Sequence, residues 1–120
     1  MGKEILIIDD SVYARKHLRK IFEDNGYTVV GEAEEGRLGI KLYQELSPDL
    51  VTLDINMPGL GGIETLVELK KVDPNVVVIM ISAKMMGPEI IKAAEAGAKN
   101  FIAKPFEDVL VIEKVKKAIG

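Results

Sequence analysis

The feature that most constrains the fold is a regular alternation of two sequence patterns. Five times, a short apolar run is followed by a longer segment whose apolar residues recur at helical spacing. The apolar runs are residues 5–8, 28–31, 49–53, 76–81 and 100–103. The helical segments lie between Ser11 and Asn25, between Glu35 and Ser47, between Ile63 and Asp73, between Gly87 and Gly97, and from Asp108 to Ile119.

This alternation predicts a parallel sheet, because strands that are joined through helices must run in the same direction. Right-handed crossovers then place helices on both faces of the sheet. The run at 28–31 is the shorter and less apolar one, as in an edge strand. We therefore expect a single doubly wound α/β domain over residues 1–120, with three layers and a five-stranded parallel sheet.

In two of the helical segments, the spacing of apolar residues predicts which side of the helix packs against the sheet. In the first helix, Ala14, Leu18, Ile21 and Phe22 are expected to face inward, and in the fourth helix Ile90, Ile91, Ala94 and Ala98. The basic residues of the first helix, Arg15, Lys16, Arg19 and Lys20, are expected to form a solvated face. His17 lies beside the inward stripe and is expected to be a packing residue at the boundary of the core.

Composition excludes several classes of function. The chain has no cysteine, which excludes disulfides, thiolate metal sites and cysteine nucleophiles. Its net charge of −3 gives no electrostatic basis for binding nucleic acid or an anionic membrane. The longest apolar run is too short to span a bilayer, and the chain passes directly into its first strand without a leader-like segment. These features predict a cytoplasmic protein.

Chemically active side chains follow four of the five predicted strands. They are Asp9 and Asp10 after the first strand, Asp54 after the third, Ser82 after the fourth and Lys104 after the fifth. Ligands of open α/β sheets bind at the edge where the strands end. Glu32, at the end of the second strand, is less informative. A strand-end aspartate alone could also cap a turn, so the chemical interpretation of Asp54 depends on the other three strand ends.

Electrostatics limit what this group can do. Two carboxylates about 4 Å apart repel by roughly 4 kcal/mol at an effective dielectric of about 20. Three converging carboxylates therefore favour a cation, and all-oxygen ligands favour Mg²⁺, Mn²⁺ or Ca²⁺ over zinc. A lysine and a hydroxyl opposite that cation suit the oxygens of a phosphoryl group. Attack of a carboxylate on phosphorus, giving an aspartyl phosphate, becomes plausible chemistry.

Together these residues resemble the receiver domain of response regulators. The resemblance rests on Asp9-Asp10, on Asp54 with Met57-Pro58 and Gly62, on Ser82-Ala83, and on Lys104-Pro105-Phe106. It covers the whole chain, as in stand-alone, CheY-like regulators of chemotaxis. It implies the flavodoxin-like strand order 2-1-3-4-5, for which CheY is a standard example.

The resemblance also implies roles for individual residues. Asp54 is expected to accept a phosphoryl group from a histidine kinase. Asp10, Asp54 and the backbone carbonyl of Asn56 are expected to ligate Mg²⁺, with Mn²⁺ as a second candidate, and Asp9 to act mainly through water. Ser82 is expected to hydrogen-bond the phosphoryl group, and Lys104 to pair with it.

Three further positions follow from the same resemblance. Phe101 matches the aromatic switch position that acts together with Ser82, and Asn56 and Lys84 match positions that tune hydrolysis. The Lys104-Pro105 bond is expected to be cis. Ser82 stands where threonine is frequent in the family, and Phe101 lacks the hydroxyl of tyrosine, so a switch at Phe101 must work by packing alone.

The expected function is a phosphorylation switch and not a turnover enzyme, with Mg²⁺-dependent self-phosphorylation and autodephosphorylation. A downstream protein, of which the flagellar motor switch is one candidate, would bind a monomer through the fourth helix, fifth strand and fifth helix. Three alternatives stay open at this point. They are a receiver excised from a larger regulator, an aspartate-nucleophile phosphatase and a flavodoxin-like cofactor carrier. The phosphatase alternative is weakened by Asn56, where haloacid dehalogenase-type enzymes need a second acid.

Overall fold

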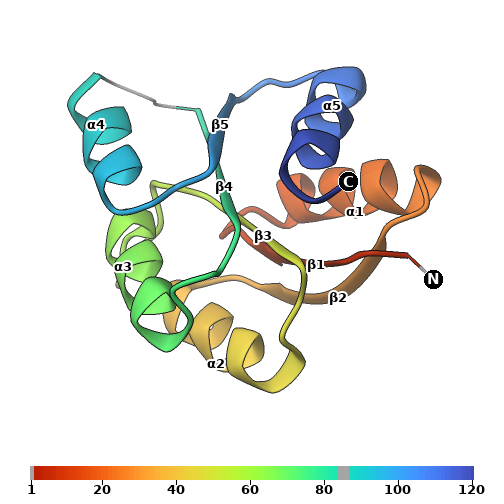
Figure 1. Cartoon of the computed structure of the whole chain (residues 1–120). Coiled ribbons are helices and arrows are strands. Elements are labelled where there is room, and N and C mark those ends of the chain that lie inside the picture. Colours follow the sequence, from red (N-terminus) through yellow and green to blue (C-terminus); the bar gives the residue numbers. More distant parts are fainter. Residues whose placement is uncertain (1, 84–86) are drawn as a thin grey trace.

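The computed structural model describes residues 2–83 and 87–120 and contains five strands that alternate with five helices (Figure 1). The strands are β1 (Glu4–Ile8), β2 (Thr28–Ala33), β3 (Leu50–Leu53), β4 (Val78–Ser82) and β5 (Asn100–Ala103). The helices are α1 (Val12–Asp24), α2 (Gly36–Leu46), α3 (Gly62–Val72), α4 (Gly87–Glu95) and α5 (Asp108–Ile119). The predicted fold class is confirmed.

All five strands form one parallel sheet in the order β2-β1-β3-β4-β5, as the family resemblance implied. Helices α1 and α5 cover one face of the sheet, and α2, α3 and α4 cover the other (Figure 1). Alternate residues of β1 enter the two cores: Ile5 and Ile7 pack beneath α1 and α5, and Leu6 and Ile8 pack on the opposite side. A strand buried on both faces needs the continuous apolar run that the sequence supplies.

Side-chain burial confirms the predicted inward face of α1 and corrects that of α4. The four residues predicted for α1 are its buried residues. In α4 only Ala93 is buried, whereas Ile91 is 58% exposed and Ala94 is exposed. Ala93 belongs to the core cluster on this side of the sheet, whereas the side chain of Ile91 lies outside it. The prediction was therefore wrong for Ile91 and Ala94, whereas Ile90 is half-buried and Ala98 packs partly buried against the core.

Two strands differ from the prediction by two residues at one end. Strand β4 begins at Val78 because the backbone N–H of Val76 donates to the carbonyl of Asp73 (3.0 Å), which closes the turn after α3. Strand β2 continues past Gly31 to Ala33, with a register shift opposite the Ile5–Leu6 step of β1. This continuation places Glu32 opposite Ile7, next to the end of β1.

Among the described residues, no helix is long and apolar enough to cross a bilayer. That finding agrees with the short apolar runs of the sequence.

Candidate functional site

Three carboxylates meet where β1 and β3 end. Asp9 and Asp10 follow β1 and Asp54 follows β3, and one oxygen from each lies within 4.8 Å of the others. We call these three residues the acidic cluster. Asp9 and Asp54 are buried, whereas Asp10 is exposed. The register of β1 with β3 produces this meeting, because Ile8 pairs with Leu53 and the chain leaves both strands at the same level.

Lys104 brings one positive charge to the acidic cluster from the end of β5. Its Nζ lies 2.7 Å from Oδ2 of Asp9 and 3.7 Å from Oδ2 of Asp54. One ammonium against three ionised carboxylates leaves a net negative charge at this edge of the sheet. The donor set consists of hard oxygen ligands, which fits a divalent cation such as Mg²⁺.

Asp54 is almost completely buried, and hydrogen bonds hold both its backbone and its side chain. The residue is 5% exposed, and its N–H donates to the carbonyl of Ile8 at 3.0 Å. Its Oδ1 accepts a 3.3 Å hydrogen bond from the N–H of Asn56. Burial, and then the charge of Asp9, raise the pKa of Asp54 to about 6, although Lys104 acts in the opposite direction. A cation at the acidic cluster would lower this pKa and favour the ionised carboxylate.

Ser82 and Asn56 face Asp54 across a polar hollow. The side-chain amide of Asn56 donates to Oγ of the buried Ser82 at 3.1 Å. The hollow has a volume of about 350 Å³ and is lined by Asp54, Asn56, Ser82, Ala83 and Lys104. A hydroxyl, an amide and an ammonium thus border the space in front of the Asp54 carboxylate.

Gly62 fixes the loop that carries Asp54. Its N–H donates to the carbonyl of Ile55 at 2.9 Å. A Cβ at this position would lie 2.2 Å from the carbonyl oxygen of Asp54 and 2.5 Å from Cα of Ile55. Only glycine lets the start of α3 pack directly on the Asp54–Ile55 backbone, so Gly62 is required by close approach.

The sequence matches the family described as response regulator receiver domain over residues 5–116. The chain belongs to this family. It is 45% identical to the chemotaxis protein CheY of Thermotoga maritima over 117 residues, covering 98% of each chain. It is 44% identical to CheY of Bacillus subtilis over 120 residues, covering 100% of both.

A solved structure gives the same assignment. The CheX–CheY–BeF₃–Mg²⁺ complex from Borrelia burgdorferi matches with a TM-score of 0.93 at 36% identity, covering 96% of this chain and 87% of that chain. The receiver domain therefore belongs to the CheY type and to two-component signalling. Receiver domains bind Mg²⁺, which fits the acidic cluster, and CheY-like receivers are not turnover enzymes.

The structure brings together most of the predicted site residues of this receiver domain. Asp9, Asp10, Asp54, Ser82, Asn56 and Lys104 all contribute to the acidic cluster or to the polar hollow. Phe101 lies one strand further out, half-buried against the core on the α2–α4 side. The Lys104-Pro105 peptide bond is cis, as predicted. Lys84 lies outside the described residues.

Arg15 is the neighbour of the site that the sequence interpretation missed. It was expected on a solvated face, but its side chain is only 13% exposed and its Nη1 donates to the backbone carbonyl of Asp9 at 2.6 Å. Its Nε bonds Glu32 at 3.1 Å. Glu32 could have indicated this position, because it lies near the end of β2, the edge strand beside β1, and can pair with a basic residue of α1.

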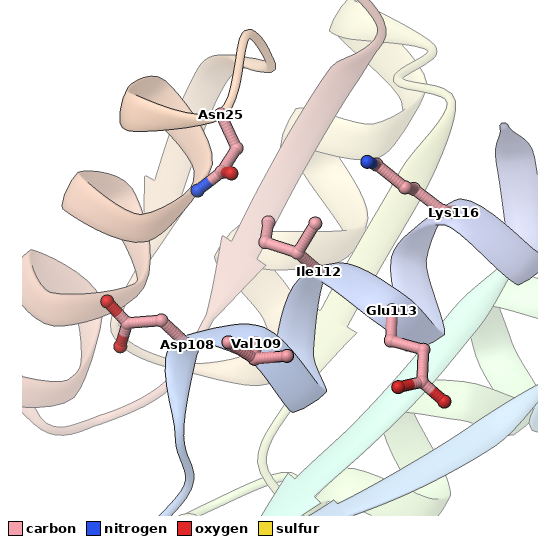
Figure 2. A pocket seen from close by; sticks show the side chains of 6 residues that line it. All are labelled: Asn25, Asp108, Val109, Ile112, Glu113 and Lys116. Carbon is pink, nitrogen blue, oxygen red and sulfur yellow. The ribbon is translucent and has the colours of Figure 1, made fainter.

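Two further hollows lie near α1 and α5. One, of about 320 Å³, adjoins the site and is lined mainly by apolar groups of Tyr13, Ala14, His17, Ala83, Lys104, Pro105 and Phe106. The half-buried ring of His17 stacks on the ring of Phe106, with 5.2 Å between the ring centroids, as expected of a residue at the boundary of the core. The other hollow, of about 390 Å³, lies between Asn25 at the end of α1 and one face of α5 (Figure 2). None of the predicted site residues that the structure describes borders the hollow between Asn25 and α5.

The raised pKa of Asp54 predicts a pH-dependent stability of the metal-free protein. In the fold Asp54 keeps its proton up to about pH 6, whereas in the unfolded chain the carboxyl ionises near its ordinary value of 3.8. As the pH rises from about 4 to 7, this residue should therefore cost the fold on the order of 2–3 kcal/mol, at 1.36 kcal/mol per pKa unit. Urea unfolding in EDTA measures the effect as the difference between the parent and Asp54→Asn.

That difference should be small near pH 4 and should grow with pH, with the asparagine variant becoming the more stable protein. A difference that does not change between about pH 4 and pH 7 would contradict the assignment of a raised pKa to Asp54.

Proposed function

We propose that this receiver domain is a phosphoacceptor response regulator. Asp54 takes a phosphoryl group from the phosphohistidine of a histidine kinase, and the aspartyl phosphate changes which protein the domain binds. The observation that carries the proposal is the buried Asp54 carboxylate, 3.7 Å from the ammonium of Lys104 and within 4.8 Å of two further carboxylates. A structural aspartate that only caps a turn gains nothing from two acids beside it.

The transfer forms one bond and breaks one. A carboxylate oxygen of Asp54 attacks phosphorus, the phosphorus–nitrogen bond of the donor breaks, and the histidine leaves with its electron pair and takes up a proton. Bound Mg²⁺ supplies positive charge that stabilises the phosphoryl oxygens in the transition state. Asp10, Asp54 and the backbone carbonyl of Asn56 are the proposed ligands, with Asp9 acting through water.

Lys104 lies within ion-pair distance of both Asp9 and Asp54. In the unphosphorylated chain its Nζ is closer to Asp9, at 2.7 Å, than to Asp54, at 3.7 Å. Phosphorylation gives position 54 a charge of about −2 and new acceptor oxygens. We propose that Lys104 then pairs with the phosphoryl group and Ser82 donates its hydroxyl to it. Oγ of Ser82 can keep accepting the hydrogen bond from Asn56, because a hydroxyl donates and accepts at the same time.

The proposed output surface consists of α4, β5 and α5. Phe101 in β5 is half-buried, and its backbone carbonyl accepts a 2.6 Å hydrogen bond from Nζ of Lys114 in α5. Ile91 on α4 is exposed. We propose that a shift of Ser82 reaches Phe101 through the pairing of β4 with β5 and is recognised at this surface by a partner. Asn56 and Lys84 are proposed to tune hydrolysis of the phosphoryl group.

We propose a chemotaxis-type role for the chain as a single-domain monomer in the cytoplasm. The support is its alignment over essentially the whole length of two chemotaxis CheY proteins. A flagellar motor switch protein is the proposed target, and binding of a switch-derived peptide should be tighter after phosphorylation. Equal affinity of the phosphorylated and unphosphorylated chain for that peptide would remove the motor switch as the target.

Incubation with acetyl phosphate tests the proposed function. The chain should gain the mass of one phosphoryl group when Mg²⁺ is present and should gain none in EDTA. A phosphatase would instead leave the protein mass unchanged and release phosphate from a simple phosphate ester in many turnovers. That second result would replace the proposal by the enzyme alternative.

Ser82→Ala should separate phosphorylation from switching. The variant lacks the hydroxyl but keeps Asp54, Lys104 and the acidic cluster, so phosphorylation should continue within about tenfold of the parent rate, since one hydrogen bond contributes about 1 kcal/mol. The NMR shift changes that phosphorylation causes at Phe101 should be lost. Ser82→Thr keeps the hydroxyl and serves as the control. If phosphorylated Ser82→Ala shows the same NMR shift changes at Phe101 as the parent, Ser82 does not transmit phosphorylation to Phe101.

A further inference from the structure

We propose that Arg15 is a positioning residue for the metal site, and that it acts by fixing the Asp9–Asp10 peptide. This inference rests on the proposed function, in which Asp10 ligates Mg²⁺. Arg15 contacts neither Asp10 nor Asp54 in the described hydrogen bonds; its bond is to the backbone carbonyl of Asp9. By holding that carbonyl, Arg15 orients the peptide unit that leads into Asp10.

The segment of Asp9 is held on both sides. Its N–H donates to the carbonyl of Ala33 in β2 at 3.0 Å, and its carbonyl accepts from Nη1 of Arg15 at 2.6 Å. Its side chain is held as well, because Oδ1 accepts from the N–H of Ser11 at 2.9 Å and Oδ2 pairs with Lys104. The orientation of the Asp9 carbonyl is therefore set chiefly by Arg15.

Asp10 depends on that orientation. It is exposed, and within the described part of the chain its carboxylate makes no hydrogen bond or ion pair. Among residues 2–83 and 87–120, no hydrogen bond or ion pair fixes the rotamer of Asp10, so the position of its carboxylate near Asp9 and Asp54 depends on its backbone. The Asp9 carbonyl and the Asp10 nitrogen share one planar peptide unit, so a bond that fixes the carbonyl also fixes the point from which the Asp10 side chain leaves.

Arg15 is itself fixed from the opposite side. Its Nε bonds Oε1 of Glu32 at 3.1 Å, while Oε2 of the same carboxylate accepts from Nε of Arg19 at 2.6 Å. Glu32 lies in β2 opposite Ile7 of β1. The planar guanidinium thus links β2 to the residue that follows β1, with Nε on Glu32 and Nη1 on the Asp9 carbonyl. A lysine ammonium lacks this rigid fork.

The charge of Arg15 and its positioning role predict opposite effects on metal binding. A cation beside the acidic cluster repels Mg²⁺, so removal of the charge alone should tighten binding. Loss of an outer partner that orients a metal ligand typically weakens metal affinity about 10- to 100-fold. The direction of the change therefore separates the two roles.

The experiment compares Mg²⁺ affinity, measured by calorimetry and by NMR titration, in the parent, Arg15→Met, Arg15→Lys and a control. Lys20→Met is the control, because it removes one positive charge from the same helix at an exposed ion pair with Asp24. We expect Arg15→Met to bind Mg²⁺ about tenfold more weakly than the parent. Arg15→Lys, which keeps the charge, should also bind more weakly, and Lys20→Met should bind like the parent.

A second measurement needs no metal. The carbonyl carbon shift of Asp9 and the amide nitrogen shift of Asp10 in EDTA should change in both Arg15 variants and stay unchanged in Lys20→Met. Tighter or unchanged Mg²⁺ binding in folded Arg15→Met and Arg15→Lys overturns the inference while leaving the proposed function intact. Failure of the parent to bind Mg²⁺ saturably overturns both.

Discussion

Replacement of Asp54 by asparagine is expected to lower the rate of phosphorylation by acetyl phosphate at least about a thousandfold, since loss of a nucleophile removes the reaction path itself. An amide oxygen cannot form an acyl phosphate. Asp9 is buried as well and lies closer to Lys104, but among the three carboxylates of the acidic cluster it is Asp54 that borders the polar hollow. The measurement is the intact mass of the protein over time in excess acetyl phosphate and Mg²⁺.

Asp24→Asn provides the matched control for this substitution. It makes the same chemical change at an exposed residue of α1 whose ion pair, among the residues that the structure describes, is with Lys20. Phosphorylation of this control should proceed at the parent rate. Asp54→Asn should remain folded, because it removes a buried charge that is held near two other acids. Phosphorylation of Asp54→Asn at more than a few per cent of the parent rate would mean that another residue is the acceptor.

The second large effect is expected for Gly62→Ala. The added methyl group would meet backbone atoms of Asp54 and Ile55 at 2.2 and 2.5 Å, and backbone cannot move aside as a flexible side chain can. We expect the free energy of unfolding to fall by about 3 kcal/mol, the upper part of the range for overpacking. We also expect slower phosphorylation, because relief of the clash must displace the segment that carries Asp54.

Gly87→Ala is the matched control, since Gly87 opens α4 as Gly62 opens α3. An added methyl group at Gly87 meets nothing within 4 Å among the described residues, so its stability should be equal to or slightly above that of the parent. Urea unfolding compares the two variants directly. A stability loss below about 1 kcal/mol in Gly62→Ala would show that α3 can shift without cost and that the close approach is not required.

The sequence predicted the sheet and the strand-end residues because both follow from local pattern. A run such as Ile5–Ile8 is apolar at every position only when both of its faces are buried, and parallel strands must present their ends at one edge. The acidic cluster and Lys104 follow from that geometry without knowledge of any side-chain contact. The strand order came from the family resemblance and was confirmed.

Features that depend on relative placement could not be predicted in this way. The segment of α4 carries apolar residues on more than one side, and the side that packs inward, marked by the buried Ala93, depends on how the helix sits in the folded protein. Arg15 has the sequence context of a solvated helix residue, and only the extension of β2 to Glu32 turns its side chain toward Asp9. The Asn56–Ser82 hydrogen bond joins the loop after β3 to the last residue of β4, 26 residues further along the chain.

The central claim is that Asp54 carries the phosphoryl group, and chemical mapping of the acceptor tests it most directly. The chain is phosphorylated with acetyl phosphate and Mg²⁺, the acyl phosphate is reduced with borohydride, and peptide mass spectrometry locates the resulting homoserine. The account predicts homoserine at position 54 and at neither Asp9 nor Asp10. Homoserine at Asp9 or Asp10, or none at all after measurable phosphorylation, would contradict it.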